Sequence, residues 1–234
     1  MTTFGLITEG YTDQLLLEGV LEGLLNAQDD DLRVNYISPV WDETDAAQGQ
    51  KAGWYQVFEY CKYVENLSRD LQYNDYLIIQ IDTDVSEDIH YDIPQKNNGN
   101  DLSPEELIDC VIAKFQNLIG EPLFTEYGER IIFAISVHSI ECWLLPIFGN
   151  NPAEKKKTVN CLKTLNRKLN AKHGFTIDQN NKSAGDYYEK LAGYFANKKR
   201  NALIQLGSHN PSFHIFLSKL CMIFPDPLQD NPAA

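Results

Sequence analysis

The hydrophobic positions along the chain follow two different periods. Continuous apolar runs of strand length occupy residues 4–8, 34–38, 76–82 and 130–137. Between them, apolar side chains recur every three or four positions over residues 12–25, 54–71 and 104–119, which predicts helices, and a short apolar helix follows the last run over residues 139–146. Strand and helix therefore alternate four times. This alternation predicts an α/β fold with a mainly parallel, Rossmann-like sheet flanked by helices.

The pattern changes after residue 150, where no further strand is predicted. Helical periodicity continues over residues 153–169, 186–197 and 212–224. We therefore divide the chain into an α/β part over residues 1–150 and a helical extension over residues 151–234 that packs on it.

The charges are distributed unevenly between these two parts. The chain carries a net charge of -13, which argues against unaided binding to nucleic acid. Residues 1–150 contain 7 basic against 27 acidic residues, whereas residues 151–234 contain 13 basic against 6 acidic ones. One interpretation is two solvated faces that differ in composition. The other is an acidic metal site beside a basic surface that holds phosphates.

Composition and cysteine pattern bear on where the chain works. A hydrophobic content of 43% is enough for a full core, yet no apolar run has the length of a membrane helix and the start has no signal-peptide pattern. The five cysteines are scattered, with no CxxC pair, which argues against a disulfide framework and a cysteine zinc site. We expect a soluble chain in the cytoplasm, with no membrane contact.

Acidic residues follow three of the four predicted strands. Glu9 comes after the first, Asp82 and Asp84 end the third, and Glu141 lies just beyond the fourth. The carboxyl ends of parallel strands meet at one edge of a sheet, so these side chains are expected to lie close together. Each acid alone has a plainer interpretation as a turn residue or a helix first-turn acid. Together they suit a hard divalent cation, Mg²⁺ or Mn²⁺.

Two motifs carry a resemblance to a known family. The first strand ends in Thr8-Glu9-Gly10-x-Thr12-Asp13, and a later one ends in Ile81-Asp82-x-Asp84. This arrangement resembles the Toprim superfamily over about residues 1–148. The segment from Ser139 to Leu145 also looks like the Ile-Glu-x-Trp-Leu-Leu segment of small stand-alone bacterial Toprim-like proteins.

The resemblance implies a function and a set of residues. It implies a Toprim-like fold in which Glu9, Asp82 and Asp84 hold Mg²⁺ or Mn²⁺ and act on phosphodiesters of DNA or RNA. Glu141, which follows the fourth predicted strand, is a further candidate catalytic residue at the same edge. Glu9 is either a metal ligand or a general base. The relatives include nucleases of OLD-type and PARIS-type anti-phage systems, which implies a toxic effector working with an ABC-type or OLD-type ATPase partner. Homo-oligomerisation and the choice between DNA and RNA stay open.

Lysines of the extension are the candidates for phosphate binding. Lys155, Lys156 and Lys157 begin a basic helix, and Lys182 precedes the next one. They would hold phosphates by charge, whereas the plainer interpretation is a solvated face or a docking surface for a protein.

Two other functions remain open from the sequence. An Asp-x-Asp nucleotide-sugar transferase would use Asp82 and Asp84 to hold a metal and a diphosphate, but it leaves Glu9 without a role. A non-catalytic binding module of a defence complex would have no use for the acids at all.

Overall fold

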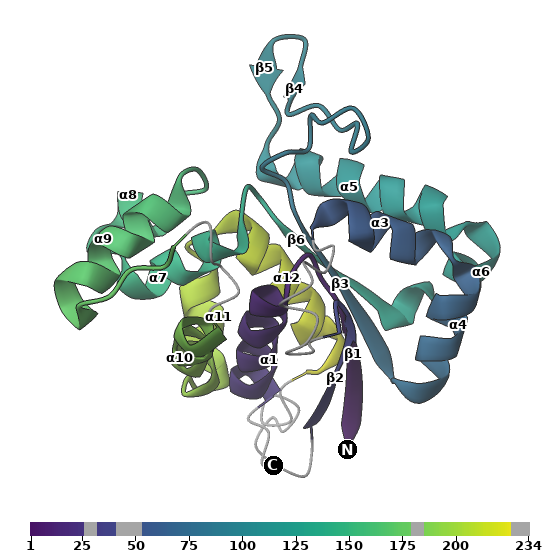
Figure 1. Cartoon of the computed structure of the whole chain (residues 1–234), viewed down its shortest axis with the longest axis horizontal. Coiled ribbons are helices and arrows are strands. Elements are labelled where there is room, and N and C mark those ends of the chain that lie inside the picture. The colour runs from purple at the N-terminus through teal and green to yellow at the C-terminus, as the bar shows by residue number, and fades with distance from the viewer. Residues whose placement is uncertain (26–31, 41–52, 179–184, 226–234) are drawn as a thin grey trace, which may run out of the picture.

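Four parallel strands form the central sheet of the computed structural model, which describes residues 1–25, 32–40, 53–178 and 185–225. The strands lie in the order β2-β1-β3-β6 (Figure 1), and each neighbouring pair is parallel. Their bounds are β1 (Thr2–Ile7), β2 (Leu32–Ser38), β3 (Tyr76–Asp82) and β6 (Ile131–Ser136). The structure confirms the α/β class with a parallel sheet.

Among the described residues, four helices cover one face of this sheet. They are α3 (Trp54–Lys62), α4 (Val64–Tyr73), α5 (Pro104–Ile119) and α6 (Glu121–Tyr127), followed by the short η1 (Gly128–Arg130). Leu77, Ile79 and Ile81 of β3 point into the core on this side. The predicted helix over 104–119 is confirmed, and Ser103 and Glu106 form a capping box at its start. Helix α6 was not predicted.

The predicted helix over 54–71 is two helices. Tyr63 has extended backbone angles and separates α3 from α4. The Tyr60 hydroxyl donates a 2.7 Å hydrogen bond to Asp70, which joins the two helices across this break. Both helices still present their apolar positions to the same core, so periodicity alone did not reveal the change of axis.

The other face is covered by the first helix, by the segment that follows β6 and by the extension. Helices α1 (Tyr11–Leu25), α10 (Gly185–Ala196), α11 (Arg200–Gly207) and α12 (Pro211–Ile223) lie here, together with η2 (Ile140–Leu144), α7 (Leu145–Phe148), α8 (Pro152–Lys155) and α9 (Cys161–His173). Phe4, Leu6 and Ile78 of the sheet share one core with Phe195 and Phe213 of the extension. The extension thus packs on the sheet, while the division into two domains at residue 150 stays a prediction. Helix α11 was not predicted.

The predicted basic helix over 153–169 is wrong. Helix α8 ends at Lys155 and α9 begins at Cys161. Asn160 has a φ of 54°, a left-handed conformation through which a right-handed helix cannot continue. Lys156 and Lys157 therefore lie in the connection, and only Lys155 is helical within α8.

One loop of the chain differs from the sequence expectation. The polar loop after β3 contains a small antiparallel hairpin, β4 (Lys96–Asn97) and β5 (Asn100–Asp101). Asn98 and Gly99 both have positive φ, as an Asn-Gly hairpin turn requires.

No helix in the described ranges is long and apolar enough to cross a membrane.

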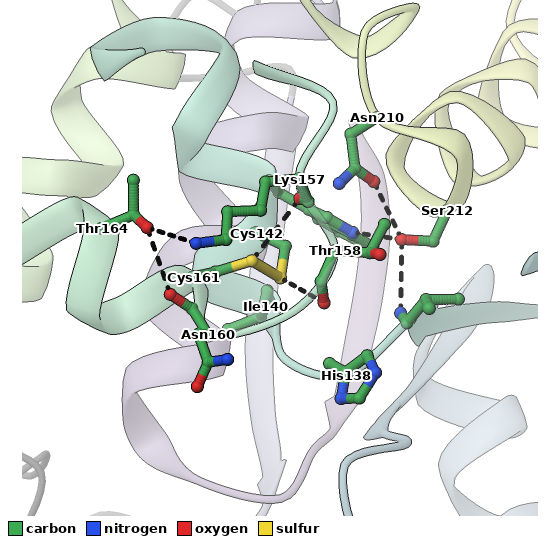
Figure 2. Close-up of a disulfide and its surroundings, with 12 residues drawn as sticks. His138, Ile140, Cys142, Lys157, Thr158, Asn160, Cys161, Thr164, Asn210 and Ser212 are labelled. Carbon is green, nitrogen blue, oxygen red and sulfur yellow. Dashed lines mark hydrogen bonds between the residues drawn. A yellow bond between two sulfur atoms is a disulfide. The ribbon is translucent and has the colours of Figure 1, made fainter. Parts of the chain in front are cut away.

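One pair of cysteines is bonded, although the scattered cysteine pattern argues against a disulfide framework. Cys142 and Cys161 are bonded, and both are buried (Figure 2). They are 19 residues apart, and the packing of α9 against η2 brings them together. Because disulfides persist mainly in oxidising compartments, the cysteine pattern no longer supports the cytoplasm, which stays a prediction.

The extension is fixed to the sheet layer by close contact between α1 and α10. A Cβ atom built on Gly19 would lie 2.5 Å from the carbonyl oxygen of Ala192, and one on Gly23 would lie 2.2 Å from that of Phe195. Real Cβ atoms do not approach backbone this closely, so glycine is required at both positions. The two helix backbones are therefore in direct contact.

We predict that Gly23→Ala lowers the free energy of unfolding by about 1–3 kcal/mol, because the added methyl forces α10 away from α1. Chemical denaturation measures the change. Gly193→Ala on the same α10 is the control, since its Cβ would meet only Asn197 at 3.8 Å. That control should be neutral or more stable by up to about 1 kcal/mol through helix propensity. Equal stability of both variants would contradict the close packing.

Candidate functional site at the carboxyl edge of the sheet

The candidate site lies where the order of the strands reverses. The chain leaves β1 for β2 on one side and later forms β3 on the other side of β1. Helices leave the carboxyl ends of such strands on opposite faces, which opens a crevice where ligands of α/β proteins bind. Glu9 lies two residues beyond β1, and Asp82 is the last residue of β3. Both therefore flank this reversal point.

Glu9 and Asp82 are in direct contact. The Oε1 atom of Glu9 accepts a hydrogen bond of 2.6 Å from the backbone N–H of Asp82. Gln80 links the same two residues a second time: its Oε1 accepts from the Glu9 N–H at 3.2 Å, and its Nε2 donates to Asp82 Oδ1 at 2.9 Å. The sequence expectation that these acids share one place is met in geometry, while their catalytic role stays a prediction.

Gln80 is a residue of the site that the hydrophobic pattern does not indicate. It is fully buried within the run that predicts a continuous apolar strand. A signal was present: it is the one polar residue within Leu77–Ile81, and it precedes Asp82 by two positions, which places both on the same face of β3.

Asp84 lies on a loop that is tied to the loop after β6. The backbone N–H groups of Thr83 and Asp84 each donate to the carbonyl of His138 at 3.1 Å. The His138 N–H donates in return to Thr83 Oγ1 at 2.9 Å, and His138 has a φ of 63°. The Asp84 side chain is exposed, unlike Asp82. This crosslink holds the ends of β3 and β6 together.

Tyr91 contacts Asp82 from the loop that follows β3. Its hydroxyl donates to the Asp82 carbonyl at 3.0 Å and is buried. Burial raises the pKa of Tyr91 well above its ordinary value, and the charges of Glu9, Asp82 and Asp84 raise it further. The charges of three predicted site acids thus all raise the pKa of this one hydroxyl.

Glu141 is linked to Asp82 through its neighbour Ile140. The Ile140 N–H donates to Asp82 Oδ1 at 3.1 Å, and Glu141 follows it within η2. Glu141 is 2% exposed, and its Oε1 accepts a 2.8 Å hydrogen bond from the hydroxyl of Tyr188 on α10. Glu141 is therefore a buried acid of the site rather than a solvent-facing helix residue.

Two further residues of this side were not assigned to the site from the sequence. Burial raises the pKa of Tyr188, followed by the charges of Glu141, Asp13 and Asp82. Asp13 is 8% exposed in the first turn of α1, where the helix dipole favours an acid. Its position four residues after Glu9 was visible in the sequence, whereas nothing in the sequence pointed Tyr188 toward Glu141.

The donor set suits a divalent cation in its chemistry. Glu9, Asp82 and Asp84 supply carboxylate oxygens, which Mg²⁺ and Mn²⁺ prefer. Within the described ranges, however, no three side chains of the His, Cys, Asp or Glu type are gathered as a group that could hold a metal ion. The chemical type of these side chains suits the ion, but among the described residues they are not gathered closely enough to form a complete set of metal ligands.

The predicted phosphate-binding lysines have different surroundings. Lys156 is exposed and Lys155 half-buried, whereas Lys157 donates a 2.9 Å hydrogen bond to Thr164 (Figure 2). The Cys142–Cys161 disulfide fixes the end of this connection to η2, next to Glu141. Lys182 lies outside the described residues.

Comparisons with known proteins found no counterpart: no protein-family model, no curated protein and no solved structure matches the chain.

We predict that Gln80→Glu destabilises the fold by about 1–3 kcal/mol at neutral pH, because a carboxylate cannot donate to Asp82 and adds a like charge beside it. Burial and that charge should raise the folded-state pKa of the introduced carboxyl. Its protonated form can donate, so the stability is present below the unfolded pKa and is lost as pH rises through the folded one.

The measurement is the free energy of unfolding of this variant between pH 4 and 8, relative to the wild type. Gln116→Glu, on the exposed side of α5, is the control and should change stability little at any pH. A pH-independent loss for Gln80→Glu would show that the amide bridge is not the source of the effect.

Proposed function

We propose that this chain is a metal-dependent phosphodiester hydrolase acting on DNA or RNA. The observation that carries the proposal is the contact of Glu9 with Asp82 at the reversal point of a parallel sheet, with Glu141 joined to Asp82 through Ile140. Carboxylates brought together from three strand ends repel one another, and their repulsion is relieved most directly by a cation. Metal-assisted hydrolysis is the reaction class that such an edge suits best.

The proposed roles follow from the surroundings of each acid. A divalent cation held by Glu9, Asp82 and Asp84 would activate water and stabilise the leaving oxygen of a phosphodiester. Asp82 is fixed by Gln80 and by the Ile140 N–H, so its carboxylate has a defined direction. Glu9 is half-buried, which suits either a ligand or a base that takes a proton from water.

The basic segment supports a polyanionic substrate. Lys155 ends α8 and Lys156 begins the connection whose far end the disulfide fixes to η2, on the part of the chain with a positive charge balance. A local basic surface would offset the repulsion that a chain of net charge -13 exerts on nucleic acid.

The Toprim resemblance extends the proposal to a biological setting. Its Glu9 motif and Asp82-x-Asp84 motif fall on the two strand ends that are in contact. The setting it implies is the effector of a bacterial anti-phage system that works with an ABC-type or OLD-type ATPase.

We predict that Glu9→Gln and Asp82→Asn each reduce Mn²⁺- or Mg²⁺-dependent cleavage of labelled DNA or RNA by at least about 100-fold. These substitutions keep the side-chain volume and an oxygen acceptor, so the fold should persist. Calorimetry should also show weaker Mn²⁺ binding. The control is Glu87→Gln, since Glu87 is an exposed acid on the loop that follows Asp82. This variant should cleave like the wild type.

Two outcomes would contradict the proposal. Full cleavage by either site variant with Mg²⁺ present would remove Glu9 or Asp82 from the mechanism. A wild-type chain that neither binds Mn²⁺ nor cleaves any of these substrates, alone or with an ATPase partner, would favour the non-catalytic binding module.

We predict further that Lys155→Glu with Lys156→Glu reduces the slope of log affinity against log salt by about 2 units on duplex DNA. Fewer phosphate contacts are made, so fewer counterions are released on binding. Lys157 is left intact to keep its bond to Thr164. Lys62→Glu on α3, at the opposite face of the sheet, is the control. An unchanged slope on DNA and RNA would assign the segment to a protein partner or to solvent.

A further inference from the structure

We infer that Tyr188 is a positioning residue of the proposed active site, which orients Glu141 through its hydroxyl and makes α10 of the extension part of the catalytic unit. The inference rests on the proposed function. It concerns a residue that lies 47 positions from Glu141 and 106 from Asp82 along the chain.

The contact between Tyr188 and Glu141 is buried on both sides. Tyr188 is 1% exposed and Glu141 is 2% exposed, and the hydroxyl–carboxylate distance is 2.8 Å. A hydrogen bond to an ionised acceptor is stronger than one between neutral groups, and solvent does not compete with it here. The hydroxyl therefore restricts the rotation of the Glu141 carboxylate.

The position of Glu141 gives this restriction a consequence for the site. The residue before it, Ile140, donates its N–H to Asp82 Oδ1. Asp82 in turn contacts Glu9 and Gln80. A rotation of Glu141 therefore takes place one residue away from the N–H group that holds the Asp82 carboxylate.

The direction of Tyr188 is set by the close contact of α10 with α1. Gly19 and Gly23 let the two backbones touch, and α1 begins directly after Gly10 and carries Asp13 in its first turn. The charges of Asp13 and Asp82 both act on the Tyr188 hydroxyl. Since α1 and α10 cannot slide without a clash, the hydroxyl is held at a fixed place relative to Glu9, Asp82 and Glu141.

Another tyrosine of the same helix provides a matched comparison. The Tyr194 hydroxyl lies 3.2 Å from His173 Nε2 on α9, away from the acids. It occupies α10 as Tyr188 does and loses the same atom on substitution by phenylalanine. A difference between the two phenylalanine variants therefore reports the contact with Glu141 and not the loss of a hydroxyl as such.

The experiment measures kcat and KM for cleavage of labelled single-stranded DNA, duplex DNA and RNA with Mn²⁺. The variants are Tyr188→Phe, Tyr194→Phe, Glu141→Gln and the double variant Tyr188→Phe with Glu141→Gln. We expect Tyr188→Phe to lower kcat about tenfold with little change in KM, because it loosens a site group without removing a substrate contact. In the Glu141→Gln background, the same change should have no further effect.

Replacement of Tyr188 by 3-fluorotyrosine keeps the hydroxyl and the ring. It should retain at least half of the wild-type kcat, and it separates loss of the donor from loss of packing should the phenylalanine variant fold poorly.

The outcomes separate this inference from the proposed function. If the wild type cleaves and Tyr188→Phe behaves as Tyr194→Phe does, or if its effect multiplies with that of Glu141→Gln, the inference is wrong and the proposed function stands. If the wild type neither cleaves nor binds Mn²⁺ in calorimetry, the proposed function is wrong and the inference falls with it.

Discussion

The parallel pairing of β1 with β3 is the constraint on which the candidate site depends. Its register sets Ile7 opposite Ile79, so the chain that leaves β1 runs beside Gln80 and Asp82. In β3 the odd-numbered positions enter the core under α3–α6, whereas Gln80 and Asp82 share the opposite face with Ile78. A shift by one residue would send Asp82 into an apolar core and Ile81 to the site. The apolar content of β3 therefore fixes the direction of its acid.

Gathering acids at this edge carries an electrostatic cost, and the described residues offset it with hydrogen-bond donors. The backbone N–H groups of Asp82 and Ile140 and the amide of Gln80 donate to carboxylates, as does the Tyr188 hydroxyl. A buried charge that accepts such bonds is much less costly than an unpaired one. The same donors fix the direction of each carboxylate, so the network that stabilises the fold also arranges the site.

The predictable part of this molecule is the part governed by local rules. Continuous apolar runs are sufficient to locate β1, β2, β3 and β6, and the rule for parallel strand ends brings Glu9 to Asp82. Contacts between distant segments are not encoded in periodicity, which is why Tyr188 and the Cys142–Cys161 pair were missed. The basic helix over 153–169 fails for a local reason, the left-handed backbone of Asn160, because asparagine adopts that conformation only in some contexts.

The short η2 segment joins the acidic sheet part to the basic extension. Its five residues are held by three elements of the extension: Glu141 by Tyr188 of α10, Cys142 by Cys161 of α9, and Trp143 by a 2.9 Å hydrogen bond to Ser212 of α12. Removing the extension would break all three anchors and leave Glu141 and Trp143 without their buried partners. Since the disulfide ties the segment that follows Lys155 and Lys156 to the residue after Glu141, the proposed function would require the phosphate-holding surface to reach the acidic edge across this link.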